Sequence, residues 1–356
     1  MARSSHCGLR IEVRNAATLL AILAAAMGVC GCGPRPAAPW VPAKEATVWP
    51  PAPDAPRVRY EGAMTTGQAL RFATTTGSRL LDFLVGSPRF HLSAPHGMAV
   101  DATMIAIADS GGGSVHVLEK ARRRYRVVQA AGDAPLACPI GLAAGGSGDL
   151  FVADSALARV FRLSCQGKLL EELQEKFVRP AGLVHDAARG RLHVVDSGAH
   201  AVLTFGQQEG RWTLVRRLGG RGEKPGTFNF PTHAAVDAEG HLYVADSLNH
   251  RIQRFDADGK LLGSFGQAGD GTGYFAKAKG VAVDSEGHVY VADSLYDVVQ
   301  IFDKDGRFLL SFGGSGREGG SLWLPTGICI DEQDRIYVAD SGNSRIQVYQ
   351  YLREGK

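Results

Sequence analysis

Residues 231–266 read PTHAAVDAEGHLYVADSLNHRIQRFDADGKLLGSFG and contain four short apolar segments separated by turns. Before Asp246, the aliphatic residues Leu242 and Val244 alternate with other residues, which is the pattern of one buried face of a β-strand. Turns ending at Gly240 and Gly259 join neighbouring segments, and glycine supplies the positive φ that a tight hairpin needs. The stretch therefore predicts a four-stranded antiparallel meander.

The same pattern recurs along the chain. The dipeptide Asp-Ser occurs in six copies, each with aliphatic residues two and four positions before the aspartate: Asp109, Asp154, Asp196, Asp246, Asp293 and Asp340. A meander of this size cannot cover both of its apolar faces, so the copies must pack against one another. Six such sheets around one axis make an all-β, six-bladed β-propeller. The 45 glycines of the 356 residues fit a protein of many tight turns and argue against a helical bundle.

The sixth copy ends at Tyr351 with only three strands. We expect residues 57–64 (RVRYEGAM) to supply its missing outer strand and to close the ring. Residues 78–85 (SRLLDFLV) have helix-like apolar clustering and are expected to form a short cap. The sequence therefore predicts one propeller domain over residues 57–356.

Blade four resembles the NHL repeat in its pattern Pro231-x-x-x-x-Val236-Asp237, Gly240-x-Leu242-Tyr243-Val244-Ala245-Asp246-Ser247-x-Asn249-x-Arg251-Ile252. Phe265-Gly266 and Phe312-Gly313, which open glycine-rich connections, strengthen the resemblance. It extends from Ser93 to Tyr351 and is closest in the last three copies. The resemblance implies a six-bladed propeller, in agreement with the repeat count, but no single activity, because one fold hosts many functions.

The N-terminus has the features of a bacterial export signal. Three arginines precede an apolar run at residues 16–29, which is too short to span a bilayer comfortably. Val29-Cys30-Gly31-Cys32 resembles a lipobox, which implies a signal peptide over residues 1–31 and a lipidated Cys32; the alternative is an ordinary cleaved signal. Half of the 16 prolines lie in residues 33–57, so residues 32–56 are expected to form an extended tether.

The predicted location is therefore the periplasmic side of the bacterial cell envelope, with the outer membrane as the expected site of the anchor. The formal net charge is +3, and the arginines of the signal region account for most of it. A nearly neutral propeller gives no electrostatic case for nucleic-acid binding. We expect a monomeric propeller that contacts the membrane through Cys32 and binds a protein or glycan partner.

The mouth of the central channel carries the candidate binding residues. The position five residues before the aspartate that ends each inner strand, or its equivalent, holds His96, Ile140, Ala181, Thr232, Lys279 and Thr326. At the next position His233 stands where the other five copies have glycine. None of these seven residues is acidic, whereas Ca²⁺ requires several oxygen ligands. This departs from the calcium-dependent lactonases of propeller fold, and we expect no cofactor of that kind.

Residues 95–100 (PHGMAV) resemble a zinc-ligand loop of the peptidylglycine amidating lyases, which also have NHL-like propellers. That resemblance implies three histidines from alternate blades, as a catalytic zinc site requires. The matching positions in blades three and five are Ala181 and Lys279, so only His96 and His233 could converge. We therefore expect channel-lining histidines and no metal.

The remaining candidates are surface groups. The uniform Asp-Ser aspartates are expected to cap turns by accepting backbone N–H bonds. Arg159, Arg251 and Arg345, five residues after three of these aspartates, are expected to pair with them, or alternatively to bind an anionic partner. Trp323 is either an exposed anchor for a partner or packed beneath its own glycine-rich loop.

These observations favour a binding, scaffold or sensor propeller that presents one face to a protein, peptide or glycan. The binding residues are then expected among His96, Thr232, His233, Lys279, Trp323, Thr326, Arg159, Arg251 and Arg345. The alternative is a hydrolase or lyase at the channel mouth, with or without a metal, that uses His96, His233 and Lys279 for catalysis. No nucleophile elbow, phosphate loop or haem-binding Cys-x-x-Cys-His motif occurs in the sequence.

Overall fold

A computed structural model describes residues 38–65, 91–122, 124–146 and 148–353. The predicted signal peptide, the predicted lipidation site Cys32 and the predicted helix at residues 78–85 lie outside these ranges. Among the described residues, no helix is long and apolar enough to cross a membrane.

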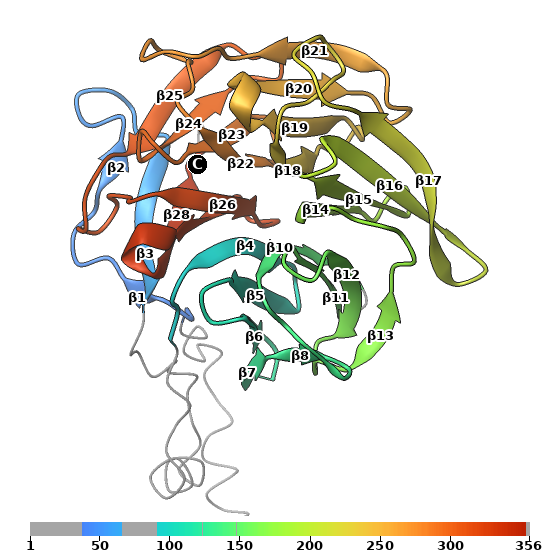
Figure 1. Ribbon diagram of the computed structural model, residues 1–356. Coiled ribbons are helices and arrows are strands. Elements are labelled where there is room, and N and C mark those ends of the chain that lie inside the picture. Colours follow the sequence, from blue (N-terminus) through green and yellow to red (C-terminus); the bar gives the residue numbers. More distant parts are fainter. Residues whose placement is uncertain (1–37, 66–90, 123, 147, 354–356) are drawn as a thin grey trace, which may run out of the picture. The chain divides into compact units, whose positions relative to one another are not determined.

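The chain folds into six four-stranded antiparallel sheets arranged around an axis, which confirms the predicted all-β six-bladed propeller (Figure 1). Blades one to three are β4 (Pro95–Val100), β5 (Met104–Asp109), β6 (Ser114–Glu119), β7 (Arg124–Val128); β10 (Pro139–Ala144), β11 (Asp149–Asp154), β12 (Arg159–Ser164), β13 (Leu169–Glu172); and β14 (Pro180–Asp186), β15 (Arg191–Asp196), β16 (Ala201–Gln208), β17 (Arg211–Gly219).

Blades four to six are β18 (Pro231–Val236), β19 (Leu242–Asp246), β20 (Arg251–Phe255), β21 (Leu261–Phe265); β22 (Ala278–Val283), β23 (Val289–Asp293), β24 (Val298–Phe302), β25 (Phe308–Gly313); and β26 (Pro325–Ile330), β27 (Arg335–Asp340), β28 (Arg345–Tyr351), β3 (Val58–Thr65). A small hairpin, β8 (Ala130–Ala131) with β9 (Ala134–Pro135), follows blade one. The first strand of each blade lines the centre of the ring in Figure 1.

The ring closes as the sequence predicts. Strand β3 pairs antiparallel with β28, so that Thr65 lies opposite Arg345 and Val58 opposite Tyr351. The side chains of Val58 and Met64 are fully buried. An N-terminal segment thus supplies the fourth strand of the C-terminal blade, and no blade is left with three strands.

Residues 38–56, which were expected to belong to the tether, lie against blade six. Two short strands, β1 (Val41–Pro42) and β2 (Val48–Trp49), pair with the outer edge of β3. The Trp49 ring lies 5.8 Å from those of both Phe312 and Tyr349. Proline excludes a central strand but is compatible with an edge strand, so this proline-rich segment can add to the outside of a sheet.

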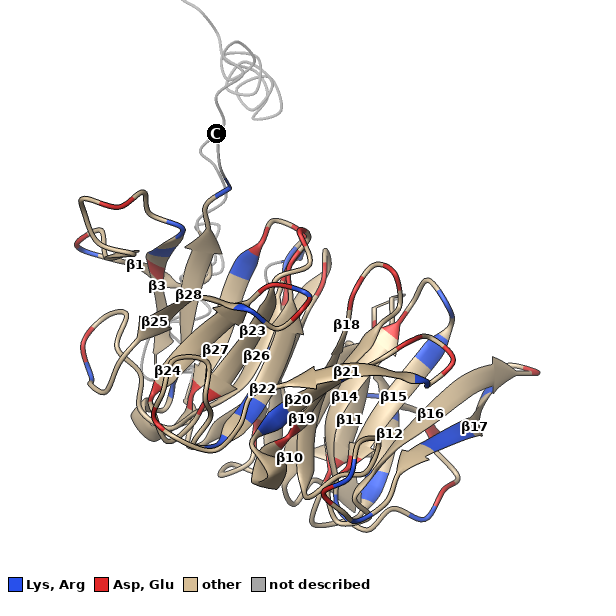
Figure 2. Cartoon of the chain, turned by 90° about the horizontal axis from the view of Figure 1, so that it is seen from above, with Lys and Arg blue, Asp and Glu red and all other residues tan. Residues whose placement is uncertain are grey.

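The core lies between neighbouring blades. Apolar residues three positions before the first residue of each inner strand are buried: Leu92, Leu136, Phe177, Phe228, Phe275 and Leu322. In the last three blades a fully buried tyrosine of the second strand fills the gap between sheets: Tyr243, Tyr290 and Tyr337. Acidic and basic residues are interspersed over the propeller in the view of Figure 2, in keeping with its nearly balanced charge.

Candidate functional site

A pocket of about 290 Å³ opens at the end of the ring where the inner strands begin. Six of the seven predicted channel residues line it, of which His96, Thr232, His233 and Lys279 are polar. Ile140 and Ala181 add apolar surface from blades two and three. The structure therefore brings His96, His233 and Lys279 into one pocket, although any two of them are at least 46 residues apart in the sequence.

The inner strands approach one another closely, and this explains why five blades carry glycine at one position. A Cβ atom on any of these glycines would lie within 2.6 Å of the neighbouring inner strand: Gly97, Gly141, Gly182, Gly280 and Gly327. Blade four has His233 at this position. Blade four is the one copy in which a polar imidazole replaces the packing glycine, and that imidazole lines the pocket.

Both ring nitrogens of His233 are buried; the backbone of Lys279 lies close enough to the ring to raise its pKa, but neither nitrogen has a well-aligned hydrogen-bond partner among the described residues. Burial, followed by the charges of His96 and Lys279, lowers the pKa of His233 to about 3. The imidazole is therefore neutral at physiological pH. Leaving such buried polar groups unpaired costs free energy, so an orphaned ring in a pocket indicates a site for a ligand.

Ser247 is a second unpaired group at the same pocket. Its side chain is 2% exposed, and its hydroxyl has no hydrogen-bond partner among the described residues. In four other blades the corresponding serine hydroxyl donates to a backbone carbonyl of an incoming loop: Ser110, Ser155, Ser197 and Ser341. Blade four thus departs from the repeat twice, and both departures face the pocket.

Two further residues of the pocket also have shifted pKa values. Burial, with the charge of Lys279, lowers the pKa of His96 to about 4. The Nδ1 atom of His96 lies 3.3 Å from the hydroxyl of Ser110. Burial, followed by the charges of Lys277 and Arg179, lowers the pKa of Lys279 below its usual value. Both imidazoles are neutral, and the lysine is surrounded by groups of its own sign.

Sequence reasoning missed several residues of this pocket. Arg179 and Lys277 stand two positions before the channel residues of blades three and five, while Phe230 and Leu248 form part of the rim. Counting back two positions in all six copies would have found the two cations. The sequence could not predict that the Ser247 hydroxyl lacks a hydrogen bond, because its Asp-Ser dipeptide is identical to the others.

The zinc site of the amidating lyases does not fit these residues. The positions in blades three and five that would complete a three-histidine set are Ala181 and Lys279, and a methyl group cannot ligate a metal. The pocket lining contains no carboxylate or thiol that could replace them. The chain therefore offers two imidazoles where a catalytic zinc ion requires three protein ligands.

The Asp-Ser aspartates have the expected structural role, with one difference. They accept N–H bonds from the loop that enters their own blade, about 16 residues earlier, as Asp109 does from Ser93 and Ala94 at 2.9 and 2.7 Å. Several also accept bonds two or three residues onward, as Asp154 does from Ala156 and Leu157. These aspartates therefore hold the loops that enter their blades, and several also hold the turn that follows them.

The predicted arginine pairs form in two of three blades. Arg251 donates to Asp246 at 2.8 Å and Arg345 to Asp340 at 2.6 Å. Both guanidinium groups also donate to carbonyls of their own glycine-rich loops. The prediction is wrong for Arg159, which pairs with Glu172 on the adjacent outer strand. None of the three arginines lines the pocket.

Trp323 and Thr326 lie outside the pocket as well. Trp323 is 40% exposed, and the guanidinium of Arg317 lies 5.2 Å from its ring centroid. It is thus partly exposed and partly covered by its own glycine-rich loop. Thr326 is buried, and its hydroxyl contacts the Pro95 carbonyl and the Ser341 hydroxyl, which joins blade six to blade one.

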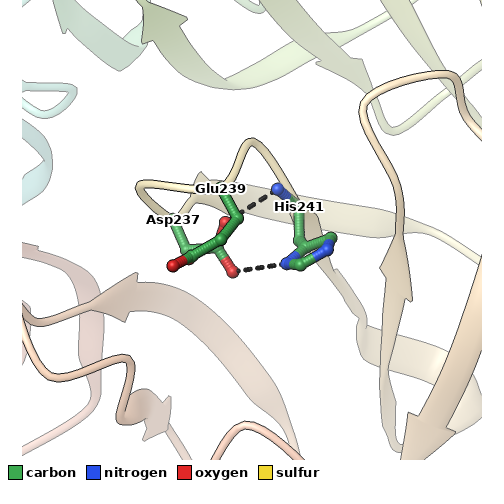
Figure 3. Close-up of side chains that lie close together, drawn as sticks. All are labelled: Asp237, Glu239 and His241. Carbon is green, nitrogen blue, oxygen red and sulfur yellow. Dashed lines mark hydrogen bonds and ion pairs between the residues drawn. The ribbon is translucent and has the colours of Figure 1, made fainter.

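Asp237, Glu239 and His241 form the one cluster among the described residues whose ligand atoms could meet at a metal (Figure 3). Asp237 is already saturated: Oδ1 accepts the His241 N–H, and Oδ2 accepts the His241 ring and the Tyr243 hydroxyl. Blade five repeats this arrangement around Asp284, and blade six repeats it around Asp331 with Arg335 in place of the histidine. The repetition identifies a structural turn.

The comparisons with known proteins agree with the fold. The NHL repeat family matches residues 228–255 and 322–349, so the chain contains NHL repeats. A probable peptidyl-alpha-hydroxyglycine alpha-amidating lyase of Caenorhabditis elegans is 34% identical over 111 residues, which are 30% of this chain. The match spans about a third of that relative, 31% of its length.

Two solved structures show the same architecture. A gluconolactonase from Xanthomonas campestris superposes with a TM-score of 0.59 at 19% identity, covering 89% of this chain and 99% of the other. A streptogramin B lyase superposes with a TM-score of 0.54 at 13% identity, covering 74% of this chain and 95% of the other. At these identities the likeness establishes the propeller fold alone.

Proposed function

We propose that this chain is a lipid-anchored binding propeller of the bacterial cell envelope, held on the periplasmic side of the outer membrane through Cys32, whose partner docks at the channel-mouth pocket. The observation that carries the proposal is the double departure of blade four from its repeat. His233 and Ser247 lack well-aligned partners at one pocket, where the other five blades have a packing glycine and four of them have a bonded serine. The rim residues Phe230 and Leu248, 37% and 45% exposed, add apolar contact surface beside them.

Site-specific photo-crosslinking in intact cells tests this proposal. A photoreactive phenylalanine analogue replaces Leu248 at the pocket rim in one variant and Leu262 in strand β21 in the control. The two positions are matched in exposure, at 45% and 41%. We expect a discrete crosslinked species from position 248 and none from position 262. Equal crosslinking from both positions, or none from 248, would contradict a binding site at the channel mouth.

A second candidate function, a hydrolase or lyase at the channel mouth, is favoured by one specific observation. His96, His233 and Lys279 converge on a single pocket, and both imidazoles are neutral and so able to accept a proton. The sequence similarity to an amidating lyase over part of the chain adds to this candidate. Incubation of the purified protein with ester and lactone substrates tests it: turnover that is lost in both His96→Gln and His233→Gly would favour the enzyme, and no turnover would count against it.

A further inference from the structure

Positively charged side chains are concentrated in the pocket. Arg179, Lys277 and Lys279 line it, and no aspartate or glutamate does. None of these three side chains makes an ion pair or hydrogen bond within the described ranges. Elsewhere in the propeller, by contrast, arginines such as Arg251, Arg345 and Arg335 each have an aspartate within 3 Å.

This arrangement is unfavourable without a negative partner. Like charges in a partly enclosed pocket repel one another more strongly than they would in bulk water, because the local dielectric constant is lower. The lowered pKa of Lys279 reflects that repulsion together with burial. A bound anion would offset the charge, and charge-assisted hydrogen bonds to it are stronger than neutral ones.

The neutral groups of the same pocket suit an anion as well. The Ser247 hydroxyl is a donor with no acceptor among the described residues, and the N–H of the neutral His233 ring has no well-aligned one. Beside them lie Phe230 and Leu248, which can cover an apolar substituent. A pocket of about 290 Å³ is at the small end of ligand sites, so it fits one charged group and a short apolar body.

We propose that this pocket binds an organic anion, whose carboxylate or phosphoryl group lies among Arg179, Lys277 and Lys279 and whose apolar part lies against Phe230 and Leu248. The inference rests on the proposed binding function and specifies its ligand chemistry. Of the three cations, Lys279 lies in an inner strand, at a predicted channel position. The three cations supply the positive charge, while His233 and Ser247 supply neutral donors. Carboxylate and phosphoryl ligands share this chemistry, and the test distinguishes them.

The test measures binding of small probes to the full chain by ligand-observed NMR. The probes are hexanoate, hexyl phosphate, 1-hexanol and inorganic phosphate. We expect at least one of the two hexyl anions to bind, and the tighter of them identifies the head group. Binding of 1-hexanol as tight as that of both anions would overturn the role of charge. Binding of inorganic phosphate as tight as that of hexyl phosphate, with no binding of hexanoate, would overturn the apolar component.

Matched variants locate the bound anion. Lys279→Met should weaken binding by about tenfold, because it removes the charged end of the side chain and keeps an unbranched apolar stem of similar shape. Lys279→Arg should retain binding, and Lys260→Met, at an exposed turn of blade four, should leave it unchanged. Ser247→Ala should weaken binding more modestly. Equal affinity of the Lys279→Met variant and the parent would overturn the assignment.

The two proposals fail separately. A partner crosslinked from position 248, with no binding of either hexyl anion, would leave the docking surface in place and overturn its anionic ligand. Anion binding that depends on Lys279, with no crosslink from position 248, would establish the pocket chemistry and contradict the macromolecular partner.

Discussion

Ring closure by the N-terminal strand gives the sharpest test of the fold, and Met64→Ala is the perturbation. Met64 is fully buried in β3 and packs with Leu92, Ile346 and Val348 between blade six and blade one. Truncating a buried methionine to alanine costs about 2–5 kcal/mol, because the lost transfer free energy adds to the cavity that remains. For a domain of a few hundred residues this corresponds to a fall in Tm of about 5–15 °C.

The assay is thermal unfolding followed by circular dichroism, with Leu262→Ala as the control. Leu262 also lies in the outer strand of a blade, but it is 41% exposed and does not join the chain ends. Its loss should change the free energy of unfolding by less than about 0.5 kcal/mol. If Met64→Ala and Leu262→Ala melt at the same temperature as the parent, β3 is not buried on blade six and the ring closes in another way.

Three further predictions concern protonation and cysteine chemistry. Burial lowers the pKa of His193 from 6.5 to about 4, so between these pH values the unfolded chain binds more protons than the folded one, and the free energy of unfolding falls as the pH drops. His193→Gln should reduce this dependence of the free energy of unfolding on pH by up to about 1.4 kcal/mol per pH unit, measured in urea titrations. Cys32→Ala should abolish acyl labelling and membrane association, and their persistence would refute the lipobox. Cys138 and Cys165 lie at opposite ends of blade two, and Cys329 lies in the inner strand of blade six. Mass spectrometry after alkylation should therefore find no disulfide among them. A Cys138–Cys165 crosslink would contradict the strand register of blade two.

The repeat made the propeller predictable because one structural requirement recurs six times. An alternating apolar strand before each Asp-Ser, and the glycine turns that join neighbouring strands in the clearest copies, leave little choice of fold. The missing fourth strand of the last copy could also be found by counting, which led to residues 57–64. The edge strands β1 and β2 could not, because a paired segment of two residues has no detectable period and its prolines resemble those of an extended linker.

The site was predictable only in part. His233 stood out as the one copy without glycine, and Lys279 as a charge at a channel position. The error at Arg159 has a local cause: blade two has Glu172 on its outer strand, where blade four has Ser264 and blade six has Ala63 at the corresponding register. A nearer acid therefore captures the guanidinium. Such competition between partners depends on cross-strand register, which a single blade's sequence does not reveal.

The pairing of β3 with β28 also determines the order in which the molecule can be completed. Val58 is synthesised nearly 300 residues before its partner Tyr351. Until that partner is available, the strand made first has an unpaired edge, which is a template for aggregation. The last blade can be finished only when almost the whole chain is present, so a premature stop near the C-terminus would leave both ends of the ring open. The ring that carries the channel-mouth pocket is thus closed only in a chain that has been made in full.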